Sequence, residues 1–130
     1  MTSHKTDIRV YYEDTDAGGI VYYANYLKFA ERARSEWLRS KGVENQKLAE
    51  QEGIYFVVKS CSIDYLRPAQ LDDMICVHTK VDEIKSASIT LNQDIYRGDE
   101  KLVSMAVKLC LINEAKRPVK ISNELKEKLA

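Results

Sequence analysis

The sequence of 130 residues predicts an α+β domain in which one long helix lies against a curved antiparallel sheet. Three observations lead to this prediction. A stretch with helical periodicity follows an early glycine-containing turn, extended stretches fill the second half of the chain, and short turn-forming segments separate those stretches. At this length we expect a single domain over residues 1–130, built around one core.

The first third of the chain predicts a strand, a turn and a helix, in that order. Thr6 to Tyr12 is rich in Ile, Val and Tyr, which favours a short strand. Residues 13–19 end this strand, because clustered Asp, Thr and Gly favour turns. From about Tyr22, apolar residues recur at spacings of three and four, which predicts a helix that ends near Gly42.

The rest of the chain predicts mainly strands. A polar segment at 44–52 is expected to add a short helix, and the lysine-rich segment 122–130 another, with Ser122 as its N-cap. Between them, long strands are predicted at Ile54 to Leu66, Met74 to Ile84, Ala87 to Tyr96 and Leu102 to Ile112. Their short connections make neighbours antiparallel. Because one helix cannot cover both sheet faces and the edges stay unpaired, we expect self-association.

Composition excludes several classes of protein. Twenty basic and twenty acidic residues cancel, so no overall charge recruits nucleic acid or an anionic membrane. No apolar stretch approaches the roughly 20 residues of a membrane helix, and the N-terminus lacks the core of a signal peptide, which predicts a cytoplasmic protein. Cys61, Cys76 and Cys110 are widely spaced in apolar surroundings, which favours reduced core residues over disulfides or a metal site. No metal or cofactor is expected.

Three acids, Glu13, Asp14 and Asp16, crowd into the turn that precedes the long helix. Their mutual repulsion would be relieved by the free N–H groups and the dipole of a helix N-terminus. A carbonyl oxygen that gains negative charge could bind such N–H groups while a carboxylate attacks the carbonyl or activates water. Simple capping explains the same pattern. Gly18 and Gly19 permit either a close approach to a ligand or a plain tight turn.

Tyrosines bracket this turn, and they could line a slot for an acyl chain or pack in the core with a polar tip near water. Core packing is the expected role for most of them: Tyr11, Tyr12, Tyr22, Tyr23 and Tyr26.

The stretch VYYEDTDAGGIVYYANYLKFAERARSEWL at 10–38, followed by YLRPAQLDDM at 65–74, resembles a known family. The sequence is similar to the acyl-CoA thioesterases associated with the Tol-Pal system, in the 4-hydroxybenzoyl-CoA thioesterase group of the hotdog superfamily. The resemblance spans essentially the whole chain. It implies a hotdog fold, in which a strongly curved antiparallel sheet wraps a long central helix. It also implies dimers joined edge to edge, often paired into tetramers, with active sites at the dimer interface.

The resemblance also implies roles for individual residues. Asp16 matches the catalytic carboxylate, and Tyr23 matches the position whose backbone amide polarises the thioester carbonyl. Relatives commonly carry a histidine at that position, so a backbone role is implied for Tyr23 and an imidazole role is not. Gly18 and Gly19 match the glycine-bearing turn. These two glycines, and Tyr22 just before Tyr23, are expected to contact substrate.

Lys85 is a further expectation from the resemblance. In the 4-hydroxybenzoyl-CoA thioesterase, a cluster of basic residues between the third and fourth strands binds the nucleotide of coenzyme A. Of such a cluster, this chain has only Lys85 in the corresponding region. We therefore predict a nucleotide contact for Lys85, although a solvated lysine in a turn is the simpler interpretation.

The predicted activity is hydrolysis of an acyl-CoA, or of an acyl group on acyl carrier protein, to a free acid and a thiol. Asp16 could attack the thioester to form a mixed anhydride or act as general base for water, and both routes stay open. A hotdog dehydratase is disfavoured because no histidine lies near the turn in the sequence. A protein of another class, a non-catalytic hotdog dimer that binds acyl groups or serves as a scaffold, is the alternative.

Overall fold

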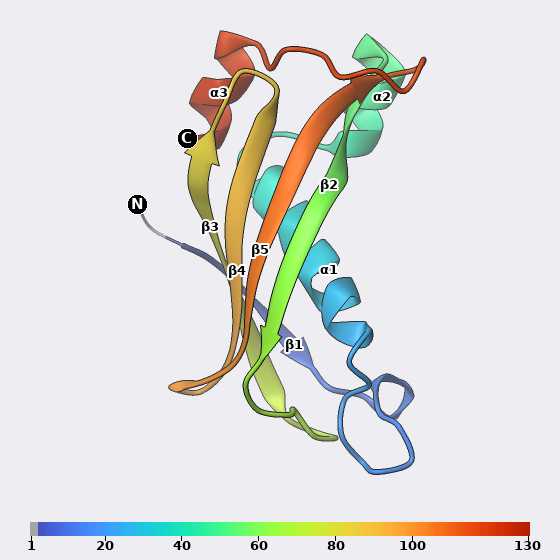
Figure 1. Cartoon of the computed structure of the whole chain (residues 1–130), viewed down its shortest axis with the longest axis vertical. Coiled ribbons are helices and arrows are strands. Elements are labelled where there is room, and N and C mark those ends of the chain that lie inside the picture. Colours follow the sequence, from blue (N-terminus) through green and yellow to red (C-terminus); the bar gives the residue numbers. More distant parts are fainter. Residues whose placement is uncertain (1–2) are drawn as a thin grey trace.

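A computed structural model describes residues 3–130 and consists of one sheet crossed by a long helix (Figure 1). The sheet has five strands in the order β1-β3-β4-β5-β2, and every neighbouring pair is antiparallel. The strands are β1 His4–Arg9, β2 Ile54–Tyr65, β3 Met74–Ile84, β4 Ser88–Arg97 and β5 Glu100–Asn113. The helices are α1 Asn25–Ser40, α2 Asn45–Glu52 and α3 Asn123–Leu129. The predicted α+β fold class is confirmed.

The first strand is shorter than predicted at its C-terminal end. We expected it to run from Thr6 to Tyr12, but β1 ends at Arg9 and the single 3-10 turn η1 occupies Tyr12–Asp14. The side chain of Asp14 explains the difference, because its Oδ2 accepts a hydrogen bond from the Tyr11 N–H at 2.9 Å. This local bond bends the chain away from an extended course.

The long helix begins later than predicted. Its expected start was Tyr22, but the N–H of Tyr22 donates to the carbonyl of Asp14 at 3.0 Å, which keeps Tyr22 in the preceding turn. Helix α1 therefore starts at Asn25. Its end agrees with the prediction, since Gly42 follows in the left-handed region at φ +76° and donates to the carbonyl of Arg39.

The core lies between the apolar face of α1 and the inner face of the sheet. Fully buried side chains include Phe29, Ala33 and Trp37 of α1, and Ile75, Val77, Leu91, Ile95, Met105 and Leu111 of the sheet. Two polar residues are also buried, Thr79 of β3 and, completely, Gln93 of β4. The Gln93 amide donates to the carbonyl of Ala30 at 3.0 Å and to Thr79 Oγ1 at 2.9 Å, and it accepts from Arg34 at 2.9 Å. These bonds satisfy the amide inside the core.

The C-terminal segment closes one end of the molecule, the upper end in Figure 1. Ser122 is the N-cap of α3 as predicted, because its Oγ accepts from the Leu125 N–H at 3.2 Å. Leu125 and Leu129 are buried, and the N–H of Ile121 donates to the carbonyl of Ser86 at 2.8 Å. The turn between β3 and β4 is thereby tied to the C-terminal segment.

The edge strand β2 leaves much of its inner side uncovered. Val58, Cys61 and Tyr65 stand opposite the buried β5 residues Leu109, Val107 and Val103 respectively, so they point to the helix side of the sheet. They are nevertheless exposed, with Val58 and Tyr65 both at 47%. Helix α1 comes closest to β1 and β3, toward the opposite edge of the sheet, which explains why much of β2 is uncovered.

All three cysteines have free thiols, but the prediction that they are core residues was wrong. Cys61 is exposed on β2, whereas Cys76 and Cys110 are half-buried. Alternation along a strand identifies the inner face, but it does not tell whether a helix covers that face.

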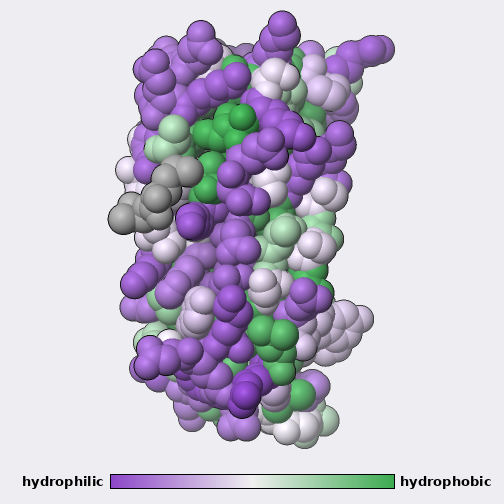
Figure 2. Space-filling model, turned by 60° about the vertical axis from the view of Figure 1, so that its left-hand side comes forward, coloured by the Kyte–Doolittle hydropathy of each residue, from purple (hydrophilic) through white to green (hydrophobic). Residues whose placement is uncertain are grey.

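The side of the molecule that faces the viewer in Figure 2, where β3 lies in Figure 1, is mainly hydrophilic. Hydrophobic residues appear there as separate patches rather than as one continuous surface.

Candidate functional site

The three clustered acids have different surroundings. Asp14 is half-buried and accepts from Tyr11 N–H, so its carboxylate is part of the 3-10 turn. Glu13 and Asp16 are exposed. The prediction that helix N–H groups stabilise the acids was wrong, because α1 starts at Asn25 and carries no acidic residue in its first turn. Local backbone N–H groups instead bind the carboxylates of Asp14 and Asp16.

Asp16 lies in a narrow hairpin turn. Its N–H donates to the carbonyl of Ile20 at 2.9 Å, and its carbonyl accepts from Gly19 N–H at 3.1 Å. Its carboxylate Oδ1 accepts from Gly18 N–H at 2.8 Å. Among residues 3–130, no hydrogen bond involves the other carboxylate oxygen, Oδ2. The carboxylate is thus oriented through one oxygen, and the second oxygen is available to a ligand or to water.

Gly18 and Gly19 serve this turn in different ways. Gly19 has φ +80°, which disfavours residues with a side chain. A Cβ atom added to Gly18 would lie 3.2 Å from Asp16 Oδ1, closer than most such contacts. Gly18 therefore leaves room for the carboxylate to fold back onto the turn.

The backbone before α1 offers free hydrogen-bond donors. The carbonyl of Tyr22 accepts from Asn25 N–H at 2.8 Å, which leaves the N–H groups of Tyr23 and Ala24 inside the turn. No backbone carbonyl in residues 3–130 accepts from either group. Ala24 is the N-cap of α1 and has no side chain that could cap the helix. An anionic oxygen could bind at this uncapped start.

A pocket of about 310 Å³ lies beside the turn. Its walls are mostly aromatic and aliphatic: Ile20, Val21, Tyr23, Tyr26, Tyr65, Leu66, Arg67 and Pro68. Tyr65 donates through its hydroxyl to the carbonyl of Tyr23 at 3.2 Å, and the rings of Tyr26 and Tyr65 are 5.7 Å apart. Burial raises the pKa of Tyr26, so this phenol stays neutral at physiological pH. The pocket suits an uncharged, apolar group.

The tyrosines around the turn are less buried than predicted. Tyr26 is buried, but Tyr11, Tyr12, Tyr22 and Tyr23 are all exposed. The expectation of core packing was therefore wrong for most of them. The rings of Tyr22 and Tyr23 contact each other with centroids 4.9 Å apart. In this way the structure brings Tyr22, Tyr23, Gly18, Gly19 and Asp16 to one end of the protomer.

Lys85 lies at the other end of the protomer. It follows β3, whose first residue, Met74, pairs with Arg9 close to the acidic turn. A strand of 11 residues is roughly 35 Å long at about 3.3 Å per residue. Figure 1 shows the turn between β3 and β4 at the opposite end of the sheet from the segment that precedes α1. One protomer does not bring Lys85 to Asp16.

Several pocket residues were not predicted from the sequence. Tyr65, Leu66 and Pro68 belong to the segment YLRPAQLDDM, which supports the resemblance but was given no role. A tyrosine at the end of a strand, followed by a proline, was the available signal. It indicates an aromatic ring fixed beside a rigid turn.

A larger hollow of about 510 Å³ lies between β1, η1 and α1. Charged residues dominate its walls, among them Asp7, Arg9, Glu13, Arg32 and Glu36. It suits an acyl group less well than the tyrosine-lined pocket does.

Within residues 3–130, no helix is both long enough and apolar enough to cross a membrane.

Comparisons with known proteins show the family to which the chain belongs. The family model described as "Thioesterase superfamily" matches residues 18–104. The acyl-CoA thioesterase YbgC of Haemophilus influenzae is 46% identical over 120 residues, which cover 92% of this chain and 88% of that protein. The acyl-CoA thioester hydrolase YbgC of Escherichia coli is 41% identical, over 81% of this chain and 78% of its own length.

Solved structures show the same architecture. A probable thioesterase from Bartonella henselae superposes with a TM-score of 0.88 at 40% identity, covering 92% of this chain and 99% of that one. A 4-hydroxybenzoyl-CoA thioesterase mutant in complex with 4-hydroxybenzoyl-CoA has a TM-score of 0.93 at 19% identity, with complete coverage of both chains. At that identity the second likeness concerns the fold alone. The predicted hotdog fold is confirmed, and the chain belongs to the thioesterase superfamily.

Proposed function

We propose that the chain is an acyl-CoA thioesterase, which hydrolyses an acyl-CoA to a free acid and coenzyme A with Asp16 as the catalytic carboxylate. The supporting observation is that Asp16, with one unbonded oxygen, is hydrogen-bonded to Ile20 of the tyrosine-lined pocket. The names of the relatives from Haemophilus influenzae and Escherichia coli support the same substrate class.

In the proposed mechanism the acyl group occupies the pocket and its thioester carbonyl lies on the free N–H groups of Tyr23 and Ala24. These donors stabilise the negative charge that develops on the carbonyl oxygen. Asp16 Oδ2 then attacks the carbonyl carbon, the thiolate of coenzyme A leaves, and water hydrolyses the mixed anhydride. Alternatively, Asp16 acts as general base and removes a proton from a water molecule, whose oxygen attacks the same carbonyl carbon. The thiolate of coenzyme A then leaves and takes up a proton.

The positions of the two histidines disfavour the dehydratase alternative. His78 lies on β3, where its ring stacks on Tyr96 with centroids 4.4 Å apart, and His4 is the first residue of β1. Neither lines the tyrosine pocket. A proton transfer at carbon would therefore lack its usual imidazole.

We further propose that two protomers pair along β2. This edge strand has 12 residues, one unpaired side, and exposed apolar side chains on its inner face, including Val58 and Tyr65. A second copy of β2 would satisfy the free backbone groups and cover these side chains. In such a dimer, or in a tetramer, Lys85 would have to reach the nucleotide of a substrate bound by another protomer.

Other parts of the proposal come from the sequence and the resemblance. We propose that residues 1–130 act as one hotdog domain in the cytoplasm. An acyl group on acyl carrier protein is the alternative substrate. The association with the Tol-Pal system stays a prediction.

The decisive experiment compares thiol release from short, long and aromatic acyl-CoAs by the wild type and by Asp16→Asn. Asparagine retains an oxygen for Gly18 N–H but removes the carboxylate charge. We expect kcat to fall by about 10³-fold or more, as for loss of a nucleophile or general base. Asp14→Asn is the matched control, because its amide oxygen can still accept from Tyr11 N–H.

Both variants should keep the melting temperature and solution mass of the wild type. Equal turnover by Asp16→Asn and the wild type would exclude Asp16 as the catalytic group. Acyl-CoA binding without thiol release by the wild type would favour the non-catalytic acyl-binding protein instead.

A further inference from the structure

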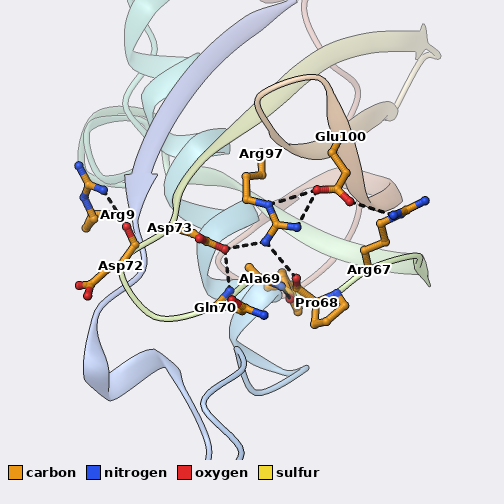
Figure 3. Close-up of polar contacts among 10 residues, drawn as sticks. Arg9, Arg67, Pro68, Ala69, Gln70, Asp72, Asp73, Arg97 and Glu100 are labelled. Carbon is orange, nitrogen blue, oxygen red and sulfur yellow. Dashed lines mark hydrogen bonds and ion pairs between the residues drawn. The ribbon is translucent and has the colours of Figure 1, made fainter.

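Charged side chains around Arg97 hold the loop of residues 66–73, which joins β2 to β3 (Figure 3). Arg97 is the last residue of β4. Its Nη1 donates to Asp73 Oδ2 at 2.7 Å and to the carbonyl of Pro68 at 3.4 Å. Its Nη2 and Nε donate to Glu100 Oε1 at 2.6 and 3.2 Å. Arg97 thus joins the loop to the turn between β4 and β5.

Asp73 extends this constraint to the centre of the loop. The same Oδ2 that pairs with Arg97 accepts from Gln70 N–H at 2.8 Å, and the N–H of Asp73 donates to the carbonyl of Gln70 at 3.1 Å. Because Arg97 also bonds to Pro68, the loop is fixed on both sides of Ala69. Hydrogen bonds to Glu100 and Asp73 raise the pKa of Arg97, so the guanidinium stays charged.

The loop in turn supports the Asp16 hairpin. The carbonyl of Ala69 accepts from Val21 N–H at 2.9 Å, and Ile20 forms an antiparallel bridge with Gln70. The carbonyl of Ile20 accepts from Asp16 N–H at 2.9 Å. An unbroken series of backbone contacts therefore runs from the segment that Arg97 holds to the catalytic turn.

We infer that Arg97 is a positioning residue, which clamps the 66–73 loop so that the Asp16 hairpin keeps its place beside the pocket. This inference rests on the proposed thioesterase function. A small displacement of a reacting group is costly, since about 1 Å can reduce the rate 10²-fold. The planar guanidinium bonds to two carboxylates and a carbonyl at once, which a lysine ammonium at the same place cannot reproduce.

The test measures kcat and KM for Arg97→Met and Arg97→Lys. We expect kcat to fall about 10- to 100-fold in Arg97→Met, with KM changed less than about threefold, and Arg97→Lys to recover part of the loss. Arg39→Met is the control, because Arg39 is an exposed arginine paired with Glu36 and Glu44 on the far part of α1. A kcat within twofold of the wild type in both Arg97 variants would overturn the inference.

Backbone amide exchange tests the clamp without reference to activity. The N–H groups of Asp16 and Val21 should exchange at least about tenfold faster in Arg97→Met, and at the wild-type rate in Arg39→Met. If Arg97→Met does not fold, Arg97→Lys decides by the same comparison. Unchanged exchange at both positions would overturn the clamp. An inactive wild type whose amides still respond to Arg97 would overturn the proposed function and leave the clamp standing.

Discussion

The two edges of the sheet differ in length, charge and cover. Strand β1 has 6 residues, carries the exposed charges Lys5, Asp7 and Arg9, and lies on the side that α1 approaches. Strand β2 has 12 residues, and three of its inner side chains, Val58, Cys61 and Tyr65, are exposed although they face the helix side. A short, charged edge resists pairing with another strand, whereas a long edge with uncovered apolar groups invites it. The comparison supports the proposal that protomers pair along β2 and not along β1.

The largest expected effect comes from a charge on the β2 edge. Val58→Asp would place an unpaired carboxylate in the proposed dimer interface, which should weaken association at least about 100-fold. Because Val58 is 47% exposed in the protomer, the substitution should leave the protomer folded. Light scattering after size exclusion should change from the mass of a dimer or tetramer to that of one protomer.

Lys5→Asp places the same charge on the β1 edge and should leave the solution mass unchanged. A wild-type protein that is monomeric at high concentration, or loss of assembly in Lys5→Asp alone, would reverse the assignment of the two edges.

A smaller effect is expected on the rates at which two cysteines are alkylated, Cys61 on the β2 edge and Cys76 on β3, the neighbour of β1. Burial and a hydrogen bond to Asp7 of β1 raise the pKa of Cys76 to about 11, so its thiolate fraction at pH 8 is only about 10⁻³. Cys61 lies on β2 and would be covered by a partner strand. Mass spectrometry should show slow labelling of Cys76 in every variant, and faster labelling of Cys61 in Val58→Asp than in the wild type. Equal labelling of Cys61 in both proteins would argue against cover by a partner.

The smallest expected effect concerns the end of β1. Arg9 donates from Nη1 to the carbonyl of Asp72 at 2.7 Å, and both groups are exposed. Arg9→Met should therefore lower the free energy of unfolding by no more than about 1 kcal/mol. Chemical denaturation measures the change, with Lys5→Met on the same strand as the control. A loss of several kcal/mol would show that the β1 edge depends on this contact far more than its exposure suggests.

The sequence predicted the helices and strands better than it predicted which of their faces are buried. Helical periodicity identified α1, β-branched or alternating residues identified the four long strands, and Ser122 as N-cap indicated α3. The exposure of Cys61 was not predictable from β2 alone, since it depends on where α1 lies. Likewise, the late start of α1 depends on the bond from Tyr22 N–H to the carbonyl of Asp14, which no periodicity reports.

The candidate site was predicted in part. The resemblance selected Asp16, Gly18, Gly19 and Tyr23, and their roles stay predictions until the variants are measured. The role of Arg97 was not predictable from the sequence. Its contacts with Asp73 and Glu100 form only once β4 has packed beside the 66–73 loop. Contacts between elements are the part of a site that local pattern does not contain.

The buried amide of Gln93 has a consequence for how the sheet assembles. Its hydrogen bonds to Ala30, Thr79 and Arg34 come from α1 and β3, so all can form only when β4 lies in one register. A slip of one residue would turn Gln93 outward and bring Asn92 or Asp94 into the apolar core. A sheet with β4 in a shifted register would therefore bury a polar group without a hydrogen-bond partner. The high free energy of such mispaired sheets favours the correct register.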